Sequence, residues 1–134
     1  MRICFLLLLF AVSASSALCA QPADCPGVDQ SLTTSQRARD IDLLKVRFPS
    51  STPTNLTHSM RQTDWLVLFA TPAGMERGIF FYHAKDHRFA YSDTWGGVAA
   101  GDSAESIAAW TRTLNPHFPS ELAKCFANAV LNGE

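Results

Sequence analysis

The sequence predicts an α+β domain in which a small antiparallel sheet is packed with C-terminal helices. Two observations lead to this class. Three apolar or aromatic runs lie between about residues 64 and 92, separated by turn-forming residues. Two segments after these runs, and one before them, carry apolar residues at helical spacing.

The three runs predict a three-stranded meander. Residues 65–70 are continuously apolar, residues 78–82 are nearly so, and residues 88–91 are rich in aromatic side chains. Turn signals at 71–74 and 85–86 separate them. Because the first two runs are apolar at every or almost every position, we expect both faces of the sheet to be covered.

The second turn sets an expected strand register. With Lys85 and Asp86 at the tip of the hairpin, Tyr82 lies opposite Phe89. In the same register the ring of residue 80 lies opposite that of residue 91. Four aromatic rings then share one face, and each cross-strand pair contributes about 0.2–1 kcal/mol.

The N-terminal helix is predicted over about residues 35–47, with Ser35 as its N-cap and Pro49 ending it. Residues 44–48 also alternate as a strand would, so a strand is the alternative there. Residues 49–63 are rich in Pro, Ser and Thr, which indicates a connecting segment.

That connecting segment carries two further signals. Thr52-Pro53 is expected to start a short helical turn with Leu56 and Met60 on one side. Asn55-Leu56-Thr57 is a glycosylation sequon, which matters only in a eukaryotic host. The sequence does not decide the kingdom of origin.

The C-terminal helices are predicted from their ends. Asp102 and Glu105 form an Asp-x-x-Glu capping pattern before a helix that stops near Asn115. A last helix begins near Pro119 and ends at Gly133. We expect its apolar face to pack on the sheet.

Residues 1–20 have the pattern of a secretory signal peptide. A positive charge at Arg2 precedes an apolar run and a small-residue exit. An apolar run of about ten residues gives about 15 Å of helix, which is half the hydrocarbon thickness of a bilayer. We therefore expect no membrane span and a periplasmic or secreted protein.

The position of cleavage stays open between Ala17 and Ala20. Lipid attachment at Cys19 is a further alternative, and the bulky Leu18 before that cysteine disfavours it. With cleavage after Ala20, residues 21–134 form a single domain.

The cysteine count predicts one disulfide in that domain. Cys25 and Cys125 remain once the signal segment is removed, and an even pair in an exported chain favours a bond between them. Two free thiols, one of them redox-active, are the alternative, but no Cys-x-x-Cys spacing is present. The disulfide would join the N-terminal lead-in to the last helix.

Charge argues against two classes of partner. Removal of Arg2 changes the formal net charge from −1 to about −2, and the remaining basic residues are scattered. Nucleic acid and anionic lipid surfaces both require clustered positive charge. Neither is expected as a partner.

Candidate contact residues lie in three loops. Trp95 is followed by two glycines in a segment of small residues, so a partner can approach the backbone there closely. Met75, Glu76 and Arg77 occupy the first hairpin loop, and Lys85 and Asp86 occupy the second. Ordinary solvated turns, and a Trp95 packed under the sheet edge, are the alternatives.

A metal site is a weaker candidate. His83 and His87 bracket the second hairpin tip, and with Asp86 they provide two imidazoles and a carboxylate, a set that zinc accepts. No further His or Glu lies close by in the sequence. Catalytic residues and cofactors are not predicted.

Two functions remain. The first is an exported, non-enzymatic binding protein of the cell envelope, such as an inhibitor or immunity protein that blocks a partner enzyme. The alternative is a small extracytoplasmic hydrolase or metal-binding protein that uses His83, Asp86 and His87. The partner's identity and the oligomeric state are beyond the sequence.

Overall fold

The computed structural model describes residues 25–50 and 54–133. The predicted signal segment 1–20, its cleavage positions and Cys19 lie outside the described residues, as do Thr52 and Pro53. No helix in the described ranges is both long and apolar enough to cross a bilayer. In chain order the elements are α1 (Thr34–Arg47), β1 (Thr54–Gln62), β2 (Trp65–Pro72), β3 (Gly78–Lys85), β4 (Arg88–Trp95), α2 (Ala104–Leu114) and α3 (Ser120–Leu131).

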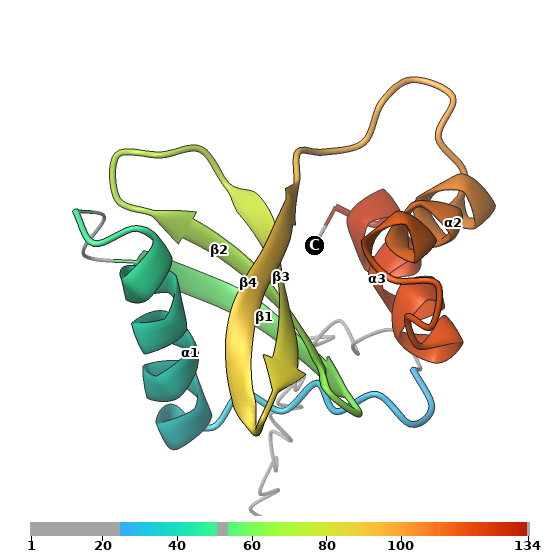
Figure 1. The fold of residues 1–134 in the computed structure, drawn as a ribbon. Coiled ribbons are helices and arrows are strands. Elements are labelled where there is room, and N and C mark those ends of the chain that lie inside the picture. Colours follow the sequence, from blue (N-terminus) through green and yellow to red (C-terminus); the bar gives the residue numbers. More distant parts are fainter. Residues whose placement is uncertain (1–24, 51–53, 134) are drawn as a thin grey trace, which may run out of the picture.

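The four strands form one antiparallel sheet in the order β1-β2-β3-β4, so each strand pairs with the next along the chain. Helix α1 lies on one face of the sheet and the pair α2 and α3 lies on the other (Figure 1). The predicted α+β class is confirmed, with four strands in place of three.

Two apolar cores result, one on each face. The α1 core contains Leu44, Leu56, Leu66, Leu68, Ala70, Phe80 and Tyr82. The α2/α3 core contains Met60, Trp65, Val67, Phe69, Ile79, Phe81, Ile107, Phe118, Leu122, Ala123, Cys125, Phe126, Ala127, Ala129 and Val130.

Successive residues of β2 and β3 alternate between these cores because neighbouring side chains of a strand point to opposite faces. This confirms that both faces are covered.

Strand β1 replaces the helical turn that was expected to carry Leu56 and Met60, and that prediction is wrong. Leu56 lies in the α1 core and Met60 in the α2/α3 core, so the two side chains point to opposite faces. A register shift between Leu56 and His58 breaks the alternation that would have marked the strand. The Thr residues that suggested a loop are also residues that favour strands.

The register of the β3–β4 hairpin also differs from the prediction. Tyr82 pairs with Tyr91, not with Phe89, because Asp86 and His87 form the tip. Both tip residues have positive φ, 50° and 61°, a conformation that Asp and His adopt more readily than most residues. The two tyrosine rings meet edge to face at 5.9 Å, and the four aromatic rings share the α1 side as expected.

Helix α1 matches its predicted range, but its cap lies earlier. Thr33, not Ser35, is the N-cap, and it forms a reciprocal capping box with Gln36. Phe48 closes the other end, where its backbone N–H donates to Leu44.

The cap of α2 lies one residue later than predicted. Ser103 and Ser106 form the capping box that was assigned to Asp102 and Glu105. The Asp102 carboxylate instead accepts from the backbone N–H of Ala99 at 2.7 Å, which closes the loop before the helix. The sequence pattern therefore located the helix but not its cap.

Helix α3 is attached to the sheet and to the N-terminal lead-in. Cys25 and Cys125 form the predicted disulfide, with their Cα atoms 5.5 Å apart. Pro119 caps the helix without a side-chain hydrogen bond, and Gln62 of β1 accepts from the backbone N–H of Leu122 at 2.9 Å. This contact satisfies one of the free N–H groups at the helix start.

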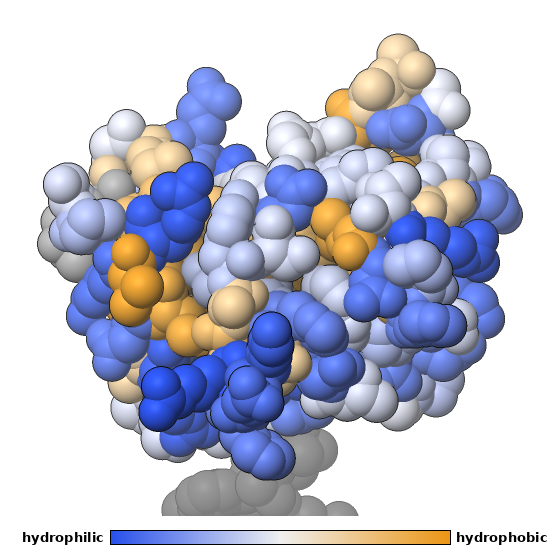
Figure 2. Space-filling model, viewed as in Figure 1, coloured by the Kyte–Doolittle hydropathy of each residue, from blue (hydrophilic) through white to orange (hydrophobic). Residues whose placement is uncertain are grey.

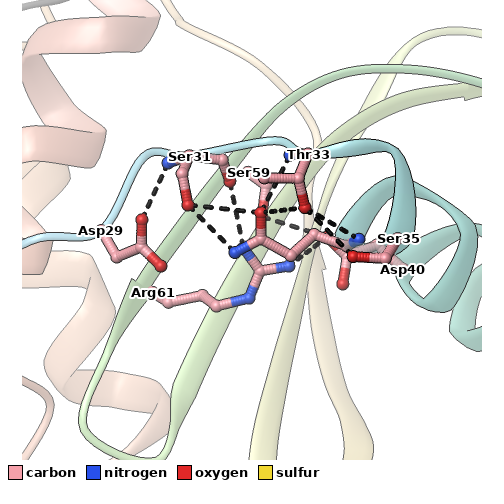
Figure 3. Close-up of polar contacts among 8 residues, drawn as sticks. Asp29, Ser31, Thr33, Ser35, Asp40, Ser59 and Arg61 are labelled. Atoms are coloured by element: carbon pink, nitrogen blue, oxygen red, sulfur yellow. Dashed lines mark hydrogen bonds and ion pairs between the residues drawn. The ribbon is translucent and has the colours of Figure 1, made fainter.

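A polar cluster attaches α1 and the lead-in to the edge of the sheet (Figure 3). Asp40 is only 3% exposed, pairs with the Arg61 guanidinium and accepts from the Ser59 hydroxyl at 3.2 Å. Arg61 also donates to the carbonyl of Ser31. Its backbone exchanges two 2.8 Å hydrogen bonds with Asp29. Because Arg61 joins the buried carboxylate of α1 to the lead-in and to its own strand, we assign the cluster a structural role.

Candidate functional site

The pairing of β3 with β4 brings two loops to one end of the sheet. Ile79 near the start of β3 pairs with Trp95 at the end of β4. The loop before β3, residues 73–77, and the loop after β4, residues 96–103, therefore leave the sheet at the same end (Figure 1). We call this part of the molecule the loop end.

A small pocket of about 190 Å³ lies at the loop end. Two of the residues that the sequence singled out, Arg77 and Trp95, both line it. Its other walls are Gly78, Ile79, Gly96, Gly97, Val98, Val130 and Gly133. A loop, the end of a strand and the end of α3 thus contribute to one hollow.

Exposed apolar side chains occur in the segments that contribute to this pocket. Four large hydrophobic residues are exposed in the described part of the chain; two of them lie in the loops of the loop end and a third is the last residue of α3. These are Met75, Val98 and Leu131, with 44%, 48% and 42% of their surface exposed. In Figure 2 the two loops form projections along the upper edge. The right-hand projection, formed by the β4–α2 loop, is mostly coloured toward the hydrophobic end of the scale. The fourth exposed residue, Val46, lies on α1.

Trp95 is both a core residue and a pocket residue. Its ring meets Phe126 edge to face at 5.4 Å, and it packs against the α2/α3 core while staying half-buried. It also lines the pocket beside Arg77. The structure thus shows the core packing that the sequence offered as one alternative, and it leaves part of Trp95 accessible at the pocket.

The second hairpin tip lies at the opposite end of the sheet. Strand β3 separates Lys85 from the loop end by eight residues, on the order of 25 Å. Lys85 and Asp86 are exposed there and do not join Arg77 and Trp95 in one surface. The structure therefore divides the predicted contact residues between two ends of the molecule.

His83 has a carboxylate partner that the sequence did not indicate. Its Nε2 lies 2.7 Å from Oδ2 of Asp64, and its ring stacks on Trp65 at 4.4 Å. Burial raises the pKa of Asp64, but hydrogen bonds from His83 and Thr63 outweigh this and hold the pKa below its usual range. Asp64 precedes β2, so only strand pairing brings it to His83.

The predicted metal ligands do not gather into a cluster. Within residues 25–50 and 54–133, no group of three or more His, Cys, Asp or Glu side chains is arranged to hold a metal ion. His83 turns to Asp64, while Asp86 and His87 form the exposed tip.

A larger hollow of about 520 Å³ lies between α2 and α3 and contains none of the predicted site residues. Its walls include four alanines and Phe118, with Arg112 and Lys124 among its charged residues. Lys124 is engaged by Glu121 at 2.8 Å. This hollow could not be predicted from the sequence, because alanines at these spacings also fit ordinary helix packing.

Val98 lies in the small-residue segment after Trp95 that the sequence predicts as a contact loop, but neither it nor Leu131 of α3 was singled out. A signal was present for each. Val98 is the one large apolar residue in a segment of glycines and alanines, and Leu131 falls outside the buried face of the last helix. Comparisons with protein-family models, curated proteins and solved structures each found no match to this chain.

Proposed function

We propose that this chain is an exported, non-enzymatic binding protein of the cell envelope, an inhibitor or immunity protein that blocks a partner enzyme through its loop end. The observation that supports this is a pocket lined by Trp95 and the exposed Val98, with exposed Met75 and Leu131 in the chain segments that adjoin its other walls. Exposed apolar side chains are common singly, but their clustering is typical of interaction sites.

The loop end has the composition of an interface centre. Met, Trp and Arg are enriched at protein interfaces, and binding energy concentrates in a few such residues. Trp95 is already packed on Phe126, so its ring loses little freedom when a partner covers it.

One wall of the pocket is tied covalently to the lead-in. Val130 is in the last turn of α3 and Gly133 follows the helix, and α3 is bonded to the lead-in through Cys125. A disulfide that persists requires an oxidising compartment, which agrees with the signal pattern of residues 1–20. Both features support export to the periplasm or the outside of the cell.

The proposal is tested by affinity capture. The oxidised mature protein is immobilised, incubated with the envelope fraction of its native host, and the retained proteins are identified by mass spectrometry. We expect one stoichiometric protein that is lost with the Met75→Ser/Val98→Ser variant. Val46→Ser is the control, since it removes an even more exposed apolar side chain from α1. Capture that survives the double variant, or disappears with the control, would contradict the proposal.

A hydrolase is the second candidate, and the pair Asp64–His83 favours it. A carboxylate that orients an imidazole is part of many nucleophilic sites, where the histidine acts as general base. Within the described residues, the side-chain hydrogen bond of His83 goes to Asp64 and not to a hydroxyl or thiol. Ester and peptide substrates turned over by the wild type but not by His83→Ala would favour this candidate. Metal analysis after gentle purification tests its metal-dependent form.

A further inference from the structure

We infer that the pocket of the loop end receives a carboxylate side chain, glutamate or aspartate, from the partner protein. This inference rests on the proposed function and adds the chemistry of the group that is bound. It follows from the size of the pocket, from its apolar walls and from Arg77, the one charged side chain among its described lining residues.

The size of the pocket suits one side chain. Its volume of about 190 Å³ lies below the range of about 300–1,000 Å³ that is typical of small-molecule sites. Four glycines line it, and at Gly96, Gly97 and Gly133 an added Cβ atom would meet nothing within 4 Å. The pocket is therefore open to a group from outside at these positions.

The walls suit a short apolar stem. Ile79, Trp95 and Val130 form one side of the hollow and belong to the buried or half-buried α2/α3 core. A methylene chain that enters here replaces water on apolar surface, which contributes about 0.8 kcal/mol for each CH₂ group.

Arg77 provides the charge. It is exposed, and in the described part of the chain it has no carboxylate, carbonyl or ring partner. Arg61 pairs with Asp40 and Arg47 lies over the ring of Tyr91, whereas three further exposed arginines, at 39, 88 and 112, resemble Arg77 in having no ion pair or ring contact among the described residues. Among these four exposed arginines, Arg77 is the one that lines the pocket of the loop end. A guanidinium beside an apolar pocket matches a carboxylate, to which it can donate two parallel hydrogen bonds.

The test uses a probe that mimics the side chain. Butanoate reproduces a glutamate side chain and butanamide is its neutral counterpart. Each is titrated at millimolar concentrations into the oxidised protein, and binding is followed by NMR at the Trp95 indole N–H and the amides of Gly96 and Gly97. We expect butanoate to bind at least tenfold more tightly than butanamide. Arg77→Gln should remove this preference, whereas Arg88→Gln, at the other end of β4, should keep it.

Equal binding of the two probes, no binding of butanoate, or the same loss with Arg88→Gln would overturn the inference. If partner capture depends on Met75 and Val98 but is unchanged by Arg77→Gln, the proposed function stands and the carboxylate assignment fails. If butanoate binds but no protein is captured, the proposed function fails. A protein side chain is then excluded as the occupant.

Discussion

Ile79 pairs with Trp95 near one end of the β3–β4 ladder, and this pairing creates the loop end. Arg77 lies two residues before Ile79, and the exposed Val98 lies three residues after Trp95. Residues that are about twenty positions apart in the sequence thereby reach one pocket. The candidate site therefore depends on strand register more than on any single motif.

Trp95→Ala should weaken both partner binding and folding. Loss of an interface anchor costs about 2 kcal/mol or more of binding free energy. Loss of a half-buried ring on Phe126 costs about 2 kcal/mol of unfolding free energy, below the 3–5 kcal/mol of a fully buried one. Urea denaturation and partner titration measure the two effects separately. A destabilised variant with full affinity would place Trp95 in the core alone.

Gly78→Ala should destabilise the protein by about 1–3 kcal/mol, as overpacking of a core does. A Cβ atom at this position would lie 2.9 Å from the buried ring of Phe80. Gly96→Ala is the matched control, because an added Cβ there meets nothing within 4 Å. Equal thermal midpoints for the two variants would contradict the packing described for Phe80.

Removal of the disulfide should lower stability substantially. Cys25 and Cys125 are separated by 100 residues, and loss of such a bond costs about 2–5 kcal/mol. The Cys25→Ala/Cys125→Ala variant should unfold at lower urea concentration than the wild type. Reduction of the wild type by dithiothreitol should produce the same shift. An unchanged midpoint under both conditions would show that the bond does not support the fold.

Asp40→Asn should cost about 2 kcal/mol, since it leaves the Arg61 guanidinium without its buried carboxylate partner. Asp42→Asn, on the same helix, removes an exposed ion pair with Lys45 and should cost less than about 0.5 kcal/mol. Chemical denaturation of the two variants tests this difference. Similar losses would mean that the cluster around Asp40 is not a structural anchor.

Stability should fall in acid through Asp29. Hydrogen bonds from Ser31, with a contribution from Arg61, hold the pKa of the Asp29 carboxyl below its usual range. A pKa that is lower in the folded protein than in the unfolded chain favours folding above about pH 4, and this contribution is lost as the pH falls further. Calorimetry from about pH 6 to pH 3 should show a steeper decline for the wild type than for Asp29→Asn. Parallel curves for the two proteins would show that Asp29 does not contribute to the loss of stability in acid.

The sequence was sufficient for the central strands, for the helices and for the disulfide. The runs at 65–70 and 78–82 are apolar on both faces and flanked by turn residues, a pattern that is typical of buried strands. Cys25 and Cys125 were predicted to pair because the other two cysteines fall in the predicted signal segment. These features depend on local composition.

The features that were not predicted depend on the backbone conformation of single residues and on the pairing of strands. A register shift next to Leu56 breaks the alternating pattern of β1, so the strand was not predicted. The positive φ of Asp86 and His87 places the hairpin tip one residue later than predicted. The contact between Asp64 and His83 follows from the pairing of β2 with β3. Arg77 and Trp95 were recognised separately, but their shared pocket follows from the register of β3 with β4.

Site-specific photo-crosslinking tests most directly whether the loop end binds a protein. Met75, Val98 or Val46 is replaced singly by p-benzoylphenylalanine, and each oxidised protein is irradiated in the native envelope fraction. We predict that positions 75 and 98 cross-link to the same protein and that position 46, on α1, does not. Cross-linking from position 46 alone, or from none of the three positions, would contradict binding through the loop end.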